Sequence, residues 1–138
     1  MSQVSIFNEN NEKITISFTS DEELENMQLE NKIAVAFGFI DEIEGPKIVG
    51  TIGTRFWKLL KFILNNNSQH RISVLAWDEN VDRIEHLIQL NQVVRVIGAN
   101  ARIRSNKYSI DYNIGNLPYE LIVYDHTVIE NLGPFERT

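Results

Sequence analysis

A single amphipathic helix pattern interrupts a series of strand-like segments, and its place in that series limits how the chain can fold. Val81, Ile84, Leu87 and Ile88 recur at helical spacing, which predicts a helix over residues 79–90. Asp78 precedes it and belongs to a residue type that caps helices. The strand-like segments before the helix are 33–40, 56–64 and 71–77, and those after it are 92–103, 107–112 and 120–128.

One helix between the third and fourth strands of an antiparallel set is the order of an OB-fold barrel. The sequence therefore predicts an all-β (mainly β) fold, a five-stranded OB-fold barrel, with a split β-sandwich as the competing architecture. Gly38 is a plausible bend in the first strand, and Gly45-Pro46 predicts a turn.

The first thirty residues predict an extension packed on the barrel. Val4–Phe7 and Lys13–Phe18 form a hairpin pattern, and Ser20 with Glu23 matches a capping box that opens a short helix. We expect residues 1–30 to be an acidic N-terminal extension, 31–130 the OB-fold domain and 131–138 a C-terminal tail.

Composition excludes several classes of protein. The chain has 138 residues, enough for one domain with a real core, and it has no cysteine, so disulfides, thiolate nucleophiles and Cys-based zinc sites are excluded. No apolar run approaches the ~18 residues of a membrane span, and the start lacks the pattern of a signal peptide. The sequence predicts a soluble, intracellular domain without cofactors or metal.

The charge is unevenly distributed along the chain. The net charge is −6, but residues 1–44 carry ten acidic and two basic residues, a net of −8. Residues 45–110 carry ten basic and four acidic residues, a net of +6. Because local potential steers ligands more than total charge does, the basic body is compatible with nucleic acid.

Three stretches carry a resemblance to a known family. They are RISVLAWDENVD over residues 71–82, LNQVVRV over 90–96 and IRSNKYS over 103–109. Together they resemble the large-subunit single-strand-binding domains of replication protein A. A germline relative used in meiotic recombination shares the same aromatic–acidic junction. The resemblance covers roughly residues 31–130.

The resemblance implies a function and two stacking residues. In that family an aromatic ring closes the third strand and a second ring follows a basic hairpin between the last two strands, and both stack on bases. The matching positions are Trp77 and Tyr108. The family's Asn near the first ring is replaced by Asp78, a carboxylate that repels phosphate or serves only as a cap.

Two readings of each ring remain open at this point. Alternation along 71–77 places Trp77 on the outer face of the strand, where it either stacks on a base or seals the barrel end against the helix. Tyr108 shares parity with Ile110 and Tyr112 and is either a groove residue or core. Phe56 and Trp57 cannot both point inward, and periodicity does not decide between them, although we favour Phe56 inward.

Basic residues gather near the two loops that flank the ligand groove of OB domains. We predict that these side chains contact phosphate: Arg55, Lys58, Arg71, Arg102, Arg104 and Lys107.

The sequence gives no support for an enzyme. The three histidines lie far apart, and GTIGT over residues 50–54 lacks the lysine and spacing of a P-loop. We therefore predict a non-enzymatic module that binds single-stranded DNA, with RNA possible, within a nuclear replication, recombination or telomere complex of OB-fold subunits. No membrane or small-molecule substrate is expected. The alternative is an OB-fold subunit that binds protein partners and little nucleic acid.

Overall fold

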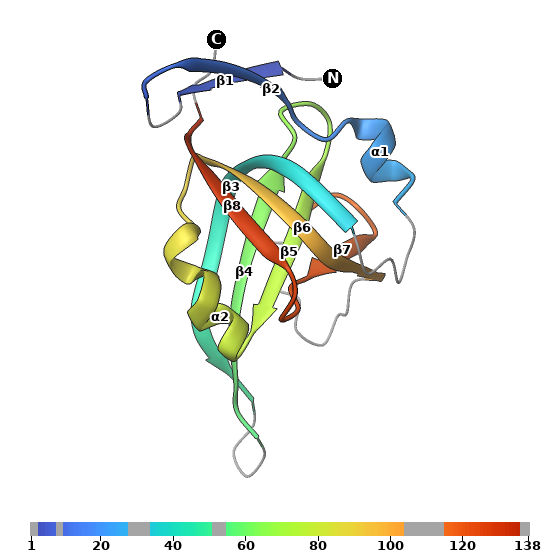
Figure 1. Cartoon of the computed structure of the whole chain (residues 1–138). Helices are drawn as coiled ribbons and strands as arrows, with labels where there is room; N and C mark the ends of the chain where they lie inside the picture. Colours follow the sequence, from blue (N-terminus) through green and yellow to red (C-terminus); the bar gives the residue numbers. More distant parts are fainter. Residues whose placement is uncertain (1–2, 8–9, 28–33, 51–54, 104–114, 136–138) are drawn as a thin grey trace.

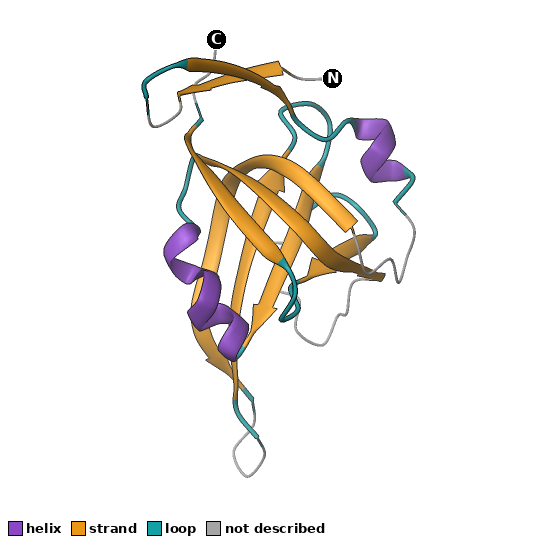
Figure 2. Cartoon of the chain, viewed as in Figure 1, coloured by secondary structure: helices purple, strands orange, loops and turns teal. Residues whose placement is uncertain are grey.

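Strands dominate the described part of the chain, and the two α-helices are short and peripheral (Figure 2). A computed structural model describes residues 3–7, 10–27, 34–50, 55–103 and 115–135. The elements are β1 (Gln3–Phe7), β2 (Lys13–Ser17), α1 (Asp21–Glu25), β3 (Ala34–Val49), β4 (Trp57–Asn65), β5 (Arg71–Trp77), α2 (Glu79–Ile84), the 3-10 helix η1 (Glu85–Leu87), β6 (Gln92–Ile103), β7 (Tyr119–Ile122) and β8 (Val128–Pro134).

The larger sheet closes into a barrel (Figure 1). β3 pairs antiparallel with both β4 and β6, and β4 pairs antiparallel with β5. β7 closes the ring, because it pairs in parallel with β5 and antiparallel with β6. β8 pairs with the first half of β6. Helix α2 lies between β5 and β6, as predicted. This closed ring confirms the OB-fold barrel and excludes the split sandwich.

Side chains that alternate along the strands fill the barrel interior. On β5 the inward set is Ile72, Val74 and Ala76, as alternation predicts, and all three are buried in the main core. Val81 and Ile84 of α2 join the same core. The other parity of β5, which includes Trp77, therefore faces outward.

The predicted turn at Gly45-Pro46 is wrong, because β3 continues through these residues to Val49. The register of β3 against β4 shifts between Glu44 and Lys47. Gly45 has a φ of +96°, and Pro46 has no N–H to contribute to a ladder, so the pair forms an irregularity within the strand instead of ending it. β3 and β4 thus extend together as a two-stranded arm beyond the barrel (Figure 1).

The region after β5 also differs from prediction. α2 ends at Ile84 and continues only as η1 to Leu87, short of the predicted residue 90. Asp78 has a φ of +51° and makes no side-chain cap bond to the helix. Its carboxylate instead accepts a hydrogen bond from the Lys58 N–H at 3.0 Å, so Asp78 ties α2 to β4.

The last predicted strand, 120–128, is two strands separated by a turn at residues 123–127. Val123 and Tyr124 at the start of the turn carry an apolar and an aromatic side chain, which the pattern could not distinguish from strand residues. β8 reaches Pro134, within the segment expected as a tail. The predicted strand at 107–112 lies outside the described residues.

The N-terminal hairpin and helix form as predicted. β1 pairs antiparallel with β2, and the Ser20–Glu23 capping box is present at the start of α1. Phe18 is 1% exposed and packs against Phe37, Phe39 and Phe135, at ring centroid distances of 5.6, 6.3 and 5.8 Å. The extension therefore shares a core with β3 and the end of the chain.

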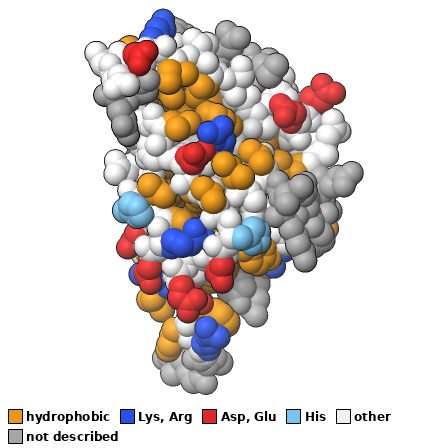
Figure 3. Space-filling view, viewed as in Figure 1, with side chains coloured by type: hydrophobic (Ala, Val, Ile, Leu, Met, Phe, Trp, Pro, Cys, Tyr) orange, Lys and Arg blue, Asp and Glu red, His pale blue; other side chains and the backbone are white. Residues whose placement is uncertain are grey.

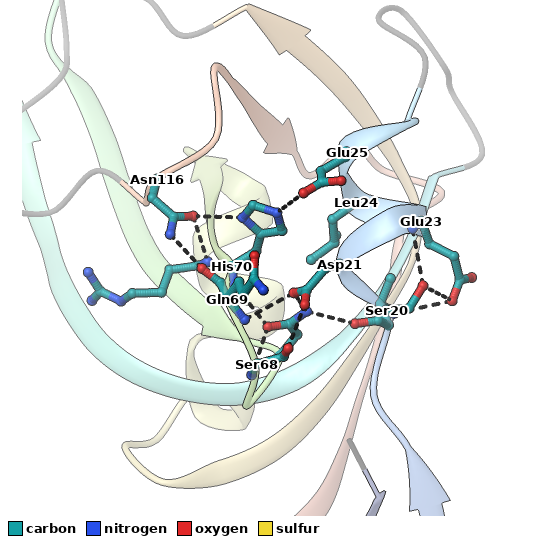
Figure 4. Close-up of polar contacts among 12 residues, drawn as sticks. Ser20, Asp21, Glu23, Leu24, Glu25, Ser68, Gln69, His70 and Asn116 are labelled. Carbon is teal, nitrogen blue, oxygen red and sulfur yellow. Dashed lines mark hydrogen bonds and ion pairs between the residues drawn. The ribbon is translucent and has the colours of Figure 1, made fainter. Parts of the chain in front are cut away.

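Polar contacts join α1 to the turn between β4 and β5 (Figure 4). The Asp21 carboxylate accepts hydrogen bonds from Asn66 Nδ2 at 2.7 Å, Ser68 Oγ at 2.5 Å and the Gln69 N–H at 3.0 Å. The bonds from Asn66 and Ser68 lower the pKa of Asp21 to about 2. The extension is thus held at this barrel end by a charged acceptor as well as by apolar packing.

The His70–Glu25 contact gives a testable pH dependence. His70 Nε2 lies 2.8 Å from Glu25 Oε1, and this hydrogen bond raises the pKa of His70 above 6.5. Because the folded state then binds the proton more tightly, the stabilisation is complete below about pH 6.5 and is lost as pH rises through the folded-state pKa. We expect Glu25→Gln to lower the free energy of unfolding by at most about 1 kcal/mol at pH 6, because the pair is partly exposed, and by almost nothing at pH 9. Urea denaturation of both proteins at the two pH values measures this, and an equal loss at both would contradict it.

Candidate nucleic-acid interface

Two tryptophans meet on the outer face of the barrel, where the arm joins it. Trp77 ends β5 and is the register partner of Leu59 on β4, while Trp57 begins β4. Both rings are half-buried, and they meet edge to face with centroids 6.4 Å apart and planes at 82°. The parity that sends Ile72, Val74 and Ala76 inward sends Trp77 to this surface.

Trp77 packs on a small buried cluster of apolar side chains that is continuous with this surface. Leu59, Leu75 and Ile122 form this cluster, called here the apolar floor, and Tyr124 also packs against it. The floor spans β4, β5 and β7, and it is separate from the core inside the barrel. Leu59, Leu75 and Ile122 are themselves buried, so the floor supports the rings from beneath, and the half-buried indole rings are the part that a nucleobase can reach. Nucleobases stack on aromatic rings without regard to sequence.

Arg55 supplies positive charge at the same place. Its guanidinium lies 4.0 Å from the centroid of the Trp57 ring, and its side chain is 69% exposed. The Asp78 carboxylate lies 3.7 Å away and offsets part of this charge. Phe56 next to it is 56% exposed, so the preference for Phe56 as the inward ring is wrong, and Trp57 is the ring that packs.

Two of the predicted basic residues lie away from the tryptophans and contact carboxylates. Lys58 lies on the other side of β4, where its ammonium contacts Asp82 of α2 at 2.5 Å. Arg71 lies at the opposite end of β5 from Trp77, and its guanidinium contacts Asp41 and Glu42, each at 2.7 Å, which raises its pKa.

Arg102 is half-buried on β6, opposite Glu120 of β7. Ala101 beside it points into the barrel core, so Arg102 faces outward, on the same surface as the apolar floor. The remaining predicted site residues lie outside the described residues: Arg104, Lys107 and Tyr108.

The N-terminal extension does not cover the tryptophans. In the described residues 3–7 and 10–27 it packs on Phe39, Val93 and the turn after β4, at the end of β5 that begins with Arg71. Trp77 lies at the other end of β5 (Figure 1). The described part of the extension therefore does not block a ligand from the Trp57–Trp77 surface.

A different face of the barrel carries hydrophobic side chains. Figure 3 shows them over β3, β6 and β8, with acidic side chains gathered lower in the view. Val35 and Val128 are exposed there, each paired across the sheet with Ile97. The Arg95–Glu130 ion pair, at 2.7 Å, lies beside them. Neither Trp57 nor Trp77 lies on this face; their edge-to-face pair belongs to the other surface.

Sequence patterns missed Tyr124. Val123 donates its N–H to the Leu75 carbonyl at 2.9 Å, which continues the parallel pairing of β7 with β5 and sets Tyr124 beside Trp77. The shared parity of Ile122 and Tyr124 was the available signal. This signal could be interpreted only once the parallel pairing of β7 with β5 was known.

Two other kinds of site are absent from the described residues. No group of three or more His, Cys, Asp or Glu side chains in these ranges is placed to hold a metal ion. Within the same ranges no helix has both the length and the apolar character that a membrane crossing needs.

Comparison with solved structures identifies the same barrel in other proteins. A chain of a replication protein A heterotrimer bound to single-stranded DNA aligns with a TM-score of 0.63 and 19% identity, over 83% of this chain and 26% of that chain. DNA-binding domain A of Saccharomyces cerevisiae replication protein A aligns with a TM-score of 0.50 and 17% identity, over 83% and 94% of the two chains. The OB domain of Ta0387 from Thermoplasma acidophilum aligns with a TM-score of 0.50 and 20% identity, over 77% and 80%.

These likenesses concern the fold. The protein has an OB-fold barrel, as the element order and the resemblance both predicted. The chain spans about a quarter of the heterotrimer chain it matches. No family model and no curated protein matches the sequence.

Proposed function

We propose that the chain binds single-stranded DNA across the Trp57–Trp77 surface. The observation that carries the proposal is the edge-to-face indole pair beside the apolar floor, with the exposed Arg55 guanidinium over one ring. Each base stacked on an aromatic ring contributes about 1–3 kcal/mol, and an adjacent cation serves the backbone. Trp77 is the principal stacking residue and Trp57 orients it. Tyr108 is a second stacking residue on the family resemblance alone.

Phosphate contacts fall to cations whose charge is least engaged by acids. Lys58 and Arg71 are held by carboxylates, so they contribute little to the site. Four basic residues remain from the predicted set, with the last two assigned from the sequence resemblance: Arg55, Arg102, Arg104 and Lys107.

A single OB fold with few cations binds weakly, and we propose that this one acts as a module of a nuclear genome-maintenance complex. One OB fold covers about 4–16 nucleotides, and micromolar affinity is the expected order for this acidic chain. Linking it to further OB folds raises the overall affinity through effective concentration. The replication protein A heterotrimer bound to single-stranded DNA, one chain of which shares the fold, supports this proposal.

A second candidate function is the binding of a protein partner through the β3–β6–β8 face. The exposed Val35 and Val128 on that face favour it. The two functions use different surfaces and are compatible. A DNA titration of the Trp77→Ala protein separates them, because only DNA binding requires the tryptophans.

Salt dependence tests the proposed contacts. A labelled dT oligomer of about 15 nucleotides, titrated with protein and followed by anisotropy, reports the affinity. With four phosphates neutralised, log K falls against log salt with a slope of about −3, from ~0.7 per contact on single strands. The same oligomer as duplex is the control, and rU of equal length tests RNA. A slope near zero, or equal binding of duplex, would contradict the proposal.

A further inference from the structure

The turn between β7 and β8 is held by side-chain hydrogen bonds. Arg83 of α2 donates to the Tyr124 carbonyl at 2.7 Å and to the Thr127 carbonyl at 2.8 Å. Thr127 Oγ1 accepts from the Tyr124 N–H and donates to the Gly98 carbonyl, both at 2.9 Å. Such a turn presents its side chains in a fixed geometry, which lowers the entropic cost of binding.

The turn places two more rings next to Trp77. Tyr124 packs on the same apolar floor as Trp77, and the His126 ring lies parallel to the Tyr124 ring, at 8° and a centroid distance of 5.9 Å. His126 is exposed. Gly98 lies next to the His126 ring: a Cβ atom added at position 98 would lie 3.5 Å from His126 Cδ2. Trp57, Trp77, Tyr124 and His126 therefore form an aromatic row across β4, β5 and the turn.

Asn100 adds an unsatisfied polar group beside this row. It lies on β6 as the register partner of Ile122 and is 3% exposed. Asn100 Nδ2 donates to the Tyr124 hydroxyl at 3.2 Å, while none of the described residues donates to Asn100 Oδ1. A buried amide oxygen of this kind calls for a hydrogen-bond donor. Every nucleobase offers an N–H group on its pairing edge when it is unpaired.

We propose that Tyr124 and His126 form a further base-binding step of the same groove. An unpaired base stacks on the His126–Tyr124 pair, and the Tyr124–Asn100 pair provides polar contact for its edge. This base-binding step rests on the proposed function. It adds a second position for a base, next to Trp77 on the side away from the β3–β4 arm. The groove then holds successive bases on Trp77 and on the turn.

Affinity measurements on three variants test the step. We expect His126→Ala to weaken binding of the dT oligomer about fivefold, within the range for a lost base stack. Asn100→Leu, which removes the amide at similar size, weakens binding severalfold. His86→Ala is the matched control, since His86 is an exposed histidine on η1, and it leaves affinity unchanged. Unchanged affinity in a folded His126→Ala protein would overturn the step.

An NMR titration separates this step from the proposed function. The chain has three histidines and two tryptophans, so each imidazole and indole gives an assignable signal. On adding the dT oligomer we expect shifts for the indole of Trp77 and the imidazole of His126, and none for His86. Indole shifts without a His126 shift would overturn the step and leave the function standing. Absence of all shifts would overturn both.

Discussion

Replacing Trp77 with alanine weakens binding of the dT oligomer at least tenfold. The ring closes β5 on the outer face, beside Trp57 and the apolar floor, and its loss removes a stacking surface that contributes about 1–3 kcal/mol per base. Tenfold corresponds to about 1.4 kcal/mol, the lower part of that range. Anisotropy titrations of the two proteins at low salt measure the difference.

Phe7→Ala is the control for the Trp77 substitution. Phe7 is an exposed aromatic residue on the N-terminal hairpin, at the other end of the barrel, so its loss leaves affinity unchanged. Circular dichroism establishes that both variants fold. A folded Trp77→Ala protein that binds as tightly as the parent would place Trp77 among residues that only seal the barrel.

Replacing Phe18 with alanine lowers the free energy of unfolding by about 3–5 kcal/mol, the usual cost of truncating a buried phenylalanine. Phe18 is 1% exposed and packs among Phe37, Phe39 and Phe135. These partners come from β3 and from the residue after β8, so the cavity would open between the extension and the barrel. Urea denaturation measures the change.

The Phe18 result bears on the domain boundary. We propose that the described residues 3–7 and 10–27 are part of the folded unit, since Phe18 and Leu24 are both buried against barrel residues. The exposed Phe7 again provides the control, because its truncation costs little. A loss below about 1 kcal/mol for Phe18→Ala, typical of surface sites, would mean that the extension packs loosely and that the barrel is stable without it.

Strand positions could be read from the sequence where burial alternates. Residues 71–77 were predicted as a strand with Ile72, Val74 and Ala76 inward, and β5 has these bounds and this orientation. The period of two fixes which side each residue faces, so the outward position of Trp77 followed directly. The capping box at Ser20 is likewise a local pattern, and it formed as expected.

Partners that are distant in sequence could not be read in this way. Nothing around Arg71 indicates that Asp41 and Glu42, about thirty residues away, would hold its guanidinium. Asp78 looked like a helix cap, but its positive φ turns the carboxylate to the N–H of Lys58. These outcomes depend on how strands are paired, which alternation along one strand does not specify.

Tyr124 shows the same limit for the candidate site. Its place beside Trp77 requires the parallel pairing of β7 with β5, which joins segments separated by more than forty residues. A pattern search favoured one long strand over 120–128, because the turn residues Val123 and Tyr124 resemble strand residues. The turn depends on Thr127 and Arg83, whose hydrogen bonds only the fold reveals.

Fluorescence of a protein with one tryptophan tests the central claim most directly. The chain has two tryptophans, so Trp57→Phe keeps a ring beside Trp77 and leaves Trp77 as the single reporter. A base stacked on Trp77 quenches its emission. We expect saturable quenching by the dT oligomer, with the same midpoint as the anisotropy titration and with reversal by salt. Bound oligomer with unchanged Trp77 emission would contradict it.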